Sequence, residues 1–237
     1  MIRAIVFDLD NTLTDFMKMK DAAITAAIDG MIDAGFALPR EQVRERIDTI
    51  YREQGLEFQH VFDELLQREF GEIDPKILAS GIVSYRRARE SELVLYPHAQ
   101  MTLLEIVKRG IRLGVVSDAP RLQVWMRLCS LGLQHVFDAV VTFEDTGERK
   151  PAPAPFREVL GRLRVDPHEA LMVGDWAERD VVGARSLGMT TVFARYGDTF
   201  DTLVSGADHD IDDLFELIAI VDGINGARDA SARPQEG

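Results

Sequence analysis

Residues 4–14 are Ala-Ile-Val-Phe-Asp-Leu-Asp-Asn-Thr-Leu-Thr. The four apolar residues predict a buried strand that ends where Asp8 and Asp10 begin. Side chains two positions apart on a strand point to the same side, so both carboxylates can line one pocket. Crowded carboxylates repel each other unless a cation neutralises them, and a hard, oxygen-binding ion such as Mg²⁺ suits them. Asp and Asn also favour turns, so this stretch alone leaves an ordinary polar strand end as the alternative.

Short β-branched segments and helical segments alternate from about residue 93 onward. This alternation predicts a doubly wound, Rossmann-like α/β fold with a parallel sheet, whose first strand is at residues 4–7. The further strands are expected at 111–116, 139–142, 171–173 and 191–194. The helices are expected at 98–109, 120–131, 154–163, 178–187 and 211–221.

Between the first strand and this alternating region, residues 16–92 contain no convincing strand. Apolar residues recur there at helical spacing, and Gly- and Pro-containing segments divide them into four helices. We therefore expect an all-helical cap domain at 16–92, inserted into an α/β core formed by 1–15 and 93–224. The polar residues 225–237 are expected to be a disordered tail.

Composition limits the possible partners and location. The chain has 237 residues, 46% hydrophobic content and a net charge of −13, which is typical of a globular protein and argues against nucleic acid or an anionic membrane surface as a partner. No segment approaches the length of a membrane span, and Asp8 and Asp10 interrupt any signal-like apolar run. The single cysteine, Cys129, allows no internal disulfide and is expected to be a buried structural thiol. These features predict a cytoplasmic protein.

Ligands of doubly wound sheets bind beyond the carboxyl ends of the strands, so polar residues at those ends are candidate site residues. The first strand places Asp8 and Asp10 there. The other expected strand ends add Ser117, Asp118, Asp175 and Asp180, and the loop after the strand at 139–142 adds Lys150. Acids, a hydroxyl and one lysine therefore converge on a single edge of the predicted sheet.

In order and spacing, these four segments resemble the motifs of the haloacid dehalogenase (HAD) superfamily of aspartate-nucleophile phosphohydrolases. The segments are D-x-D-x-T at 8–12, Ser117-Asp118, Lys150-Pro151 and Gly174-Asp175-x-x-x-x-Asp180. The helical insert resembles the C1 cap of subfamily I. Details of the second and fourth motifs resemble an archaeal-type branch of small phosphatases that includes glyceraldehyde 3-phosphate phosphatases.

The resemblance implies a Mg²⁺-dependent phosphatase that forms an aspartyl-phosphate on a small phosphorylated metabolite of the sugar or triose phosphate class. Asp8 would be the nucleophile, and Asp10 would protonate the leaving group and then activate water. Lys150 would be a fixed cation that also binds phosphate, together with Ser117 and the backbone at Asp118.

The same resemblance implies which residues hold the metal. Asp8 and Asp175 would coordinate Mg²⁺ through carboxylates, and Asp10 through its backbone carbonyl. Thr12 would brace the first turn and Asp180 would orient a metal-bound water or Lys150. Trp176 follows Asp175 where the family often has a small or acidic residue, so no ligand is assigned among residues 176–179; Glu178 is a weak candidate.

The cap is expected to choose the substrate, because the core recognises only phosphate. Phe16, Arg52 and His60 are candidate specificity residues, although each also fits an ordinary packing or surface role. The sequence leaves a phosphomutase as an alternative, followed by a haloacid dehalogenase or a non-catalytic binding protein; a dehalogenase of this superfamily lacks the second acid that Asp10 provides. Either a monomer or a homodimer is compatible with the sequence.

Overall fold

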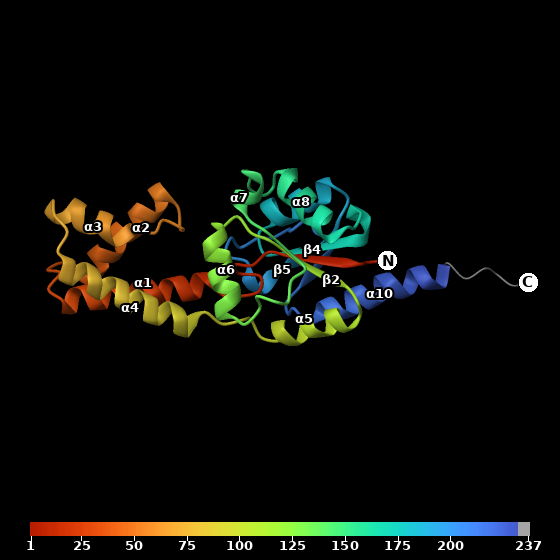
Figure 1. Cartoon of the computed structure of the whole chain (residues 1–237), viewed down its shortest axis with the longest axis horizontal. Helices are drawn as coiled ribbons and strands as arrows, with labels where there is room; N and C mark the ends of the chain where they lie inside the picture. Colours follow the sequence, from red (N-terminus) through yellow and green to blue (C-terminus); the bar gives the residue numbers. More distant parts are fainter. Residues whose placement is uncertain (232–237) are drawn as a thin grey trace, which may run out of the picture. The chain divides into compact units, whose positions relative to one another are not determined.

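The structure of the protein is a computed structural model, in which residues 1–231 are described. The chain divides into two compact units. Residues Met1–Asp15 and Leu95–Gly237 form one, here called the core unit, and Phe16–Val94 form the other, the cap unit. Figure 1 shows the sheet and its surrounding helices in the core unit, and a helical bundle in the cap unit.

The core unit is built on a parallel sheet of six strands in the order β3-β2-β1-β4-β5-β6. The strands are β1 (Ala4–Phe7), β2 (Arg112–Val116), β3 (Ala139–Val141), β4 (Ala170–Gly174), β5 (Thr190–Ala194) and β6 (His209–Ile211). This sheet confirms the predicted Rossmann-like class. Strand β6 was not predicted, because it has three residues and begins with the polar pair His209-Asp210.

Helices cover both faces of the sheet (Figure 1). One face packs against α5 (Ala99–Lys108), α6 (Arg121–Ser130) and α10 (Glu216–Ser231). The other packs against α8 (Pro153–Leu163) and α9 (Val182–Ser186). The short elements are α7 (Phe143–Thr146), a 3₁₀ turn η1 (Pro167–Glu169), a π-helical turn η2 (Ala177–Val181) and a 3₁₀ turn η3 (Arg195–Gly197).

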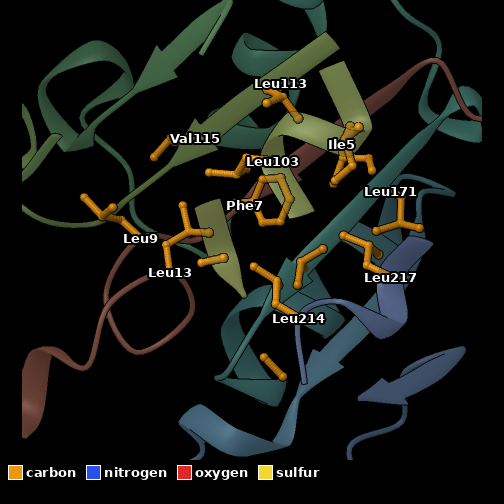
Figure 2. Packing of buried hydrophobic residues seen from close by; sticks show 14 of the residues in the cluster. Ile5, Phe7, Leu9, Leu13, Leu103, Leu113, Val115, Leu171, Leu214 and Leu217 are labelled. Carbon is orange, nitrogen blue, oxygen red and sulfur yellow. The ribbon is translucent and has the colours of Figure 1, made fainter. Parts of the chain in front are cut away.

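The strand residues alternate between the two buried faces. Ile5 and Phe7 of β1 point into the cluster with α5 and α10, where Figure 2 shows Phe7 beside Leu103. Ala4 and Val6 point into the opposite cluster with α8. Because both faces are covered, β1 is apolar throughout and fully buried, as expected for a central parallel strand. This packing holds β1 in place and thereby positions Asp8, which directly follows the strand.

The cap unit consists of α1 (Phe16–Asp33), α2 (Arg40–Gln54), α3 (Val61–Phe70) and α4 (Pro75–Glu92). The breaks between them occur where the sequence has Gly and Pro; Gly71, for example, ends α3 in the left-handed conformation that glycine adopts without steric cost. Asp74 caps α4 by accepting hydrogen bonds from the backbone N–H groups of Lys76 and Ile77. The helices pack through a separate cluster that includes Ile28, Ile47 and Leu65.

Two expectations from the sequence are wrong. Residues 225–231 belong to α10 rather than to a disordered tail, and residues 232–237 lie outside the described part. The Asn225 amide ties α10 to the start of β1, because it accepts a hydrogen bond from the Ile2 N–H at 2.6 Å and donates one to the Ile2 carbonyl at 3.3 Å. Cys129 is exposed rather than buried.

Within residues 1–231, no helix is both long enough and apolar enough to cross a membrane.

Candidate active site

A tight turn follows β1 and positions the first motif. Asn11 adopts a left-handed conformation (φ 60°), which Asn tolerates better than most residues. The backbone N–H groups of Leu13 and Thr14 donate to the Leu9 carbonyl, and that of Asn11 donates to the Thr14 carbonyl. The turn holds Asp8, which is 8% exposed, and partly exposed Asp10 at the carboxyl edge of the central strand.

Lys150 joins two of the predicted acids. Its Nζ donates to Asp8 Oδ1 at 2.5 Å and to Asp180 Oδ1 at 2.6 Å, and all three side chains are buried. The other oxygen of Asp180 accepts the Trp176 N–H at 3.0 Å. Both oxygens of Asp180 are therefore engaged with protein groups, an arrangement that suits an orienting role.

Asp175 completes a cluster of carboxylates. One oxygen from each of Asp8, Asp175 and Asp180 lies within 4.8 Å of the others. The Thr12 hydroxyl donates to Asp175 Oδ1 at 2.8 Å, so Thr12 braces Asp175 itself rather than only the turn. Glu178, the weak candidate from the sequence, is not part of this cluster.

The negative charge of the Asp8, Asp175 and Asp180 carboxylates favours protonation of Asp8 and Asp175 or the binding of a cation beside them. Burial raises the pKa of Asp8 to about 7, with Asp180 and Asp10 adding to the rise and Lys150 opposing it. Burial, Asp8 and Asp180 together raise the pKa of Asp175 to about 9. Burial alone would lower the pKa of Lys150, but Asp180 and Asp8 outweigh it and raise this pKa, so Lys150 stays charged.

The second motif lies at the end of β2. Ser117 is buried, and its hydroxyl accepts the Ala119 N–H at 3.2 Å. The Asp118 carboxylate accepts the backbone N–H of Lys150 at 2.9 Å and the Arg179 guanidinium at 3.0 Å. The Asp118 side chain therefore connects the second, third and fourth motifs.

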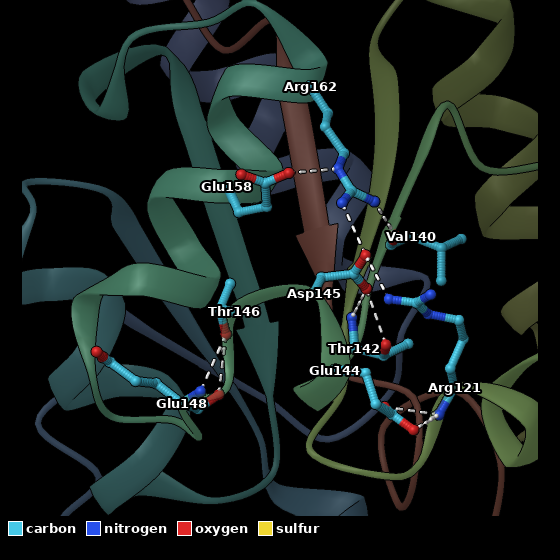
Figure 3. A network of polar contacts seen from close by, with 9 residues as sticks. All are labelled: Arg121, Val140, Thr142, Glu144, Asp145, Thr146, Glu148, Glu158 and Arg162. Carbon is cyan, nitrogen blue, oxygen red and sulfur yellow. Dashed lines mark hydrogen bonds and ion pairs between the residues drawn. The ribbon is translucent and has the colours of Figure 1, made fainter.

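A polar network stabilises the segment that leads to Lys150 (Figure 3). Asp145 accepts hydrogen bonds from the backbone and hydroxyl of Thr142, each at 2.8 Å, and forms ion pairs with Arg162 at 2.8 Å and Arg121 at 3.1 Å. Burial would raise the pKa of Asp145, but Arg162 and Thr142 outweigh it and lower this pKa to about 2. The loop that carries the catalytic lysine candidate is thus tied to both α6 and α8.

Two glycines allow close approaches around Asp175. A Cβ on Gly174 would lie closer than 3.0 Å to the Asp180 side chain. A Cβ on Gly197, in η3, would lie 2.8 Å from the Asn11 carbonyl carbon and 3.1 Å from Asp175 Cβ. Tyr196 adds a hydrogen bond from its hydroxyl to the Thr12 carbonyl at 2.8 Å. The loop after β5 therefore supports the first and fourth motifs.

Sequence reasoning missed Gly197, Tyr196, Arg179 and Arg127. Arg127 of α6 is buried, and its guanidinium lies 3.2 Å from Asp10 Oδ2. The available signal was its position between Val124 and Leu128, two apolar residues that face the core. Arg179 stacks on Trp176 at 3.7 Å, which the fourth motif alone did not indicate.

The three predicted specificity residues belong to the cap unit. Phe16 is buried at the first position of α1. Arg52 is exposed and donates to the Thr49 hydroxyl on its own helix, and the His60 side chain is 76% exposed. None of these observations assigns them a ligand.

The chain is similar to known proteins in both sequence and structure. The family model for haloacid dehalogenase-like hydrolases matches residues 2–188. A glyceraldehyde 3-phosphate phosphatase of Methanocaldococcus jannaschii is 35% identical over 93% of this chain and 97% of its own. A ribulose-1,5-bisphosphate 5-phosphatase of Halopiger xanaduensis is 32% identical over 93% of this chain and 100% of its own.

Among solved structures, a HAD phosphatase from Thermococcus onnurineus has a TM-score of 0.68 and 28% identity, covering 94% of this chain and 99% of its own. These matches confirm the sequence-based predictions of a hydrolase and a phosphatase. Together with the edge of the sheet where the four motifs meet, they show that the chain belongs to the haloacid dehalogenase-like hydrolase family.

Proposed function

We propose that the chain is a Mg²⁺-dependent phosphatase that hydrolyses a small sugar or triose phosphate through an aspartyl-phosphate on Asp8. The observation that carries this proposal is the buried contact of Lys150 Nζ with Asp8 Oδ1 at 2.5 Å, beside the carboxylates of Asp175 and Asp180. A nucleophilic carboxylate needs nearby positive charge to receive an anionic phosphoryl group, and Lys150 supplies it.

The donor set fits a divalent cation. Three buried carboxylates face one another with Lys150 as the cation in contact with two of them, and the raised pKa values of Asp8 and Asp175 reflect this excess of negative charge. Asp8, Asp175 and the Asp10 backbone carbonyl would hold the ion, since oxygen ligands suit Mg²⁺. When bound, the ion would offset negative charge on the phosphoryl oxygens.

The residues divide the reaction into two steps. In the first, a carboxylate oxygen of Asp8 bonds to phosphorus while the ester P–O bond breaks, and Asp10 gives its proton to the departing oxygen. In the second, water bonds to phosphorus, its proton passes to Asp10, and the bond between phosphorus and the Asp8 oxygen breaks. Ser117 and the backbone at Asp118 would hold the phosphoryl oxygens through both steps.

The substrate class is argued from the relatives. Their names specify glyceraldehyde 3-phosphate and the 5-phosphate of ribulose-1,5-bisphosphate, both small phosphorylated sugars. Triose phosphates are therefore the first candidates for this chain. We assign the choice among them to the cap unit, with Phe16, Arg52 and His60 as the residues to vary first. We further propose a cytoplasmic enzyme that acts as a monomer or homodimer.

A panel of phosphorylated metabolites, assayed for phosphate release with Mg²⁺, tests the substrate class. Asp8→Asn and Asp10→Asn test the mechanism with an activated aryl phosphate. Asp8→Asn should abolish turnover and leave no covalent phosphoryl group in the intact mass. Asp10→Asn keeps the nucleophile but lacks the base, so phosphorylated Asp8 should accumulate, because an activated leaving group needs little protonation.

Asp222→Asn is a matched control, since Asp222 of α10 pairs with Arg109, which directly follows α5, and both lie outside the four motifs. It should retain wild-type turnover. Chelator should abolish the activity and added Mg²⁺ should restore it. An Asp8→Asn protein that keeps most of its activity, in a preparation free of deamidation, would refute the mechanism.

A further inference from the structure

Arg127 is a buried cation that the mechanism above does not use. It lies on the core-facing side of α6 with Val124 and Leu128, and it is only 7% exposed. Moving a guanidinium out of water is unfavourable unless a partner offsets the loss of hydration. Its ion-pair partner is Asp10, with Nη1 to Oδ2 at 3.2 Å.

We propose that Arg127 is a positioning residue that fixes the orientation of the Asp10 carboxylate for both proton transfers; this rests on the proposed function. Asp10 must point at the leaving-group oxygen and then at water, and a short carboxylate side chain has several rotamers to choose from. The contact of Arg127 Nη1 with Asp10 Oδ2 favours one of these rotamers. The α6 helix, packed on the sheet through Val124 and Leu128, provides a rigid support for that contact.

Arg127 and Lys150 have separate partners. In the described part of the core unit, these two are the buried lysine and arginine side chains. Lys150 contacts Asp8 and Asp180, whereas Arg127 contacts Asp10. Arg127 does not exchange protons itself, because a guanidinium stays protonated in proteins. Its contribution is therefore made through Asp10.

This role predicts an effect that depends on the reaction step. With an activated aryl phosphate, formation of phosphorylated Asp8 needs little help from Asp10, but its hydrolysis needs the base. Arg127→Met should therefore keep the initial burst of phenolate release while the steady-state kcat and KM fall together by about tenfold or more, so that kcat/KM changes little. Phosphorylated Asp8 should accumulate in the quenched protein. With an alkyl phosphate both steps should slow, so turnover should fall without accumulation.

Two further variants distinguish positioning from structural support. Arg127→Lys keeps a charge and most of the stem, so its kcat should lie between those of the wild type and Arg127→Met. If Arg127→Met does not fold, Arg127→Lys replaces it in the burst and steady-state measurements. Arg109→Met is the matched control, since Arg109 is paired with Asp222 at 3.0 Å and precedes β2, at the amino ends of the strands and away from the four motifs. Its kinetics should match those of the wild type.

The double variant Asp10→Asn/Arg127→Met completes the test. Arg127→Met should slow the Asp10→Asn enzyme no further, because its effect passes through Asp10. The proposal is overturned if Arg127→Met, or Arg127→Lys in its place, keeps or raises the wild-type kcat, or if burst and steady state fall by the same factor. A wild-type enzyme that forms no phosphorylated Asp8 would instead refute the proposed mechanism.

Discussion

Replacing Gly197 by Ala tests whether the loop after β5 sets the geometry of the active site. The added methyl carbon would lie 2.8 Å from the Asn11 carbonyl carbon, with the carbonyl oxygen closer still, and 3.1 Å from Asp175 Cβ. Because these neighbours include backbone atoms, the steric overlap can be removed only if η3 or the turn after β1 moves, by a distance on the order of 1 Å. A misplacement of about 1 Å can cost about 10²-fold in rate, so we expect that loss in kcat/KM.

The assay is hydrolysis of an activated aryl phosphate at saturating Mg²⁺, combined with thermal unfolding. Overpacking of this kind typically costs about 1–3 kcal/mol, which should leave a folded protein with a lower Tm. Gly161→Ala is the matched control, because its Cβ would meet nothing within 4 Å and it lies inside α8. We expect Gly161→Ala to keep full activity and gain about 0.4–1 kcal/mol in stability.

Tyr196→Phe tests the same loop without overpacking, by removing only the hydrogen bond to the Thr12 carbonyl. It should lower kcat/KM by less than Gly197→Ala does. A folded Gly197→Ala protein with kcat/KM within about twofold of the wild type would refute the reasoning. Such a result would mean that the active-site geometry does not depend on the position of the loop after β5.

Two further predictions concern the polar contacts of Thr12 and Asp145. Thr12→Val removes the hydrogen bond that orients Asp175, so the Mg²⁺ concentration that gives half-maximal activity should rise about 10–100-fold. Thr102→Val is the control, because it removes a buried hydroxyl with no hydrogen-bond partner in the described structure. This control should leave the Mg²⁺ concentration for half-maximal activity unchanged. Asp145→Asn should lower the free energy of unfolding in urea by about 2 kcal/mol at pH 7. The pKa of Asp145 is about 2 in the folded protein, below the ordinary aspartate value of 3.8, so this contribution is present above pH 3.8 and lost as the pH falls toward 2. The difference in unfolding free energy between variant and wild type should narrow over that range, and a constant difference would contradict the assigned cause.

The sheet edge was predictable because its residues follow directly from strand ends. Apolar runs locate β1, β2 and β4, and parallel strands place Asp8, Ser117 and Asp175 at the same edge whatever the loops do. Lys150 is different, because it follows α7 in a loop rather than a strand end directly. Its prediction came from its place in the loop after the expected strand at 139–142, together with the spacing of the motifs. Its contacts with Asp8 and Asp180 agree with the expected role of a fixed cation.

The supporting residues were not predictable for a physical reason. Arg127 belongs to an amphipathic helix, where a charged residue is normally assigned to solvent, and only the packed structure shows its guanidinium beside Asp10. Gly197 and Tyr196 follow β5, which lies between β4 and β6, so their proximity to Asp175 after β4 depends on a strand order that periodicity does not specify. Thr12 was expected to brace its own turn, but its contact spans 163 sequence positions.

The charge balance of the core explains why these supports matter. Burial makes the carboxylates of Asp8 and Asp175 unfavourable as anions, so their pKa values rise to about 7 and about 9. As the pH rises through these values, the metal-free fold must hold more negative charge, and its stability falls. Lys150 offsets part of this charge at Asp8 and Asp180, and we infer that a divalent cation offsets the rest. The Asp10 carboxylate forms an ion pair with Arg127 and is not part of that carboxylate cluster. This separate side-chain contact suits a carboxylate that exchanges a proton, while the proposed contribution of Asp10 to the metal site is made by its backbone carbonyl.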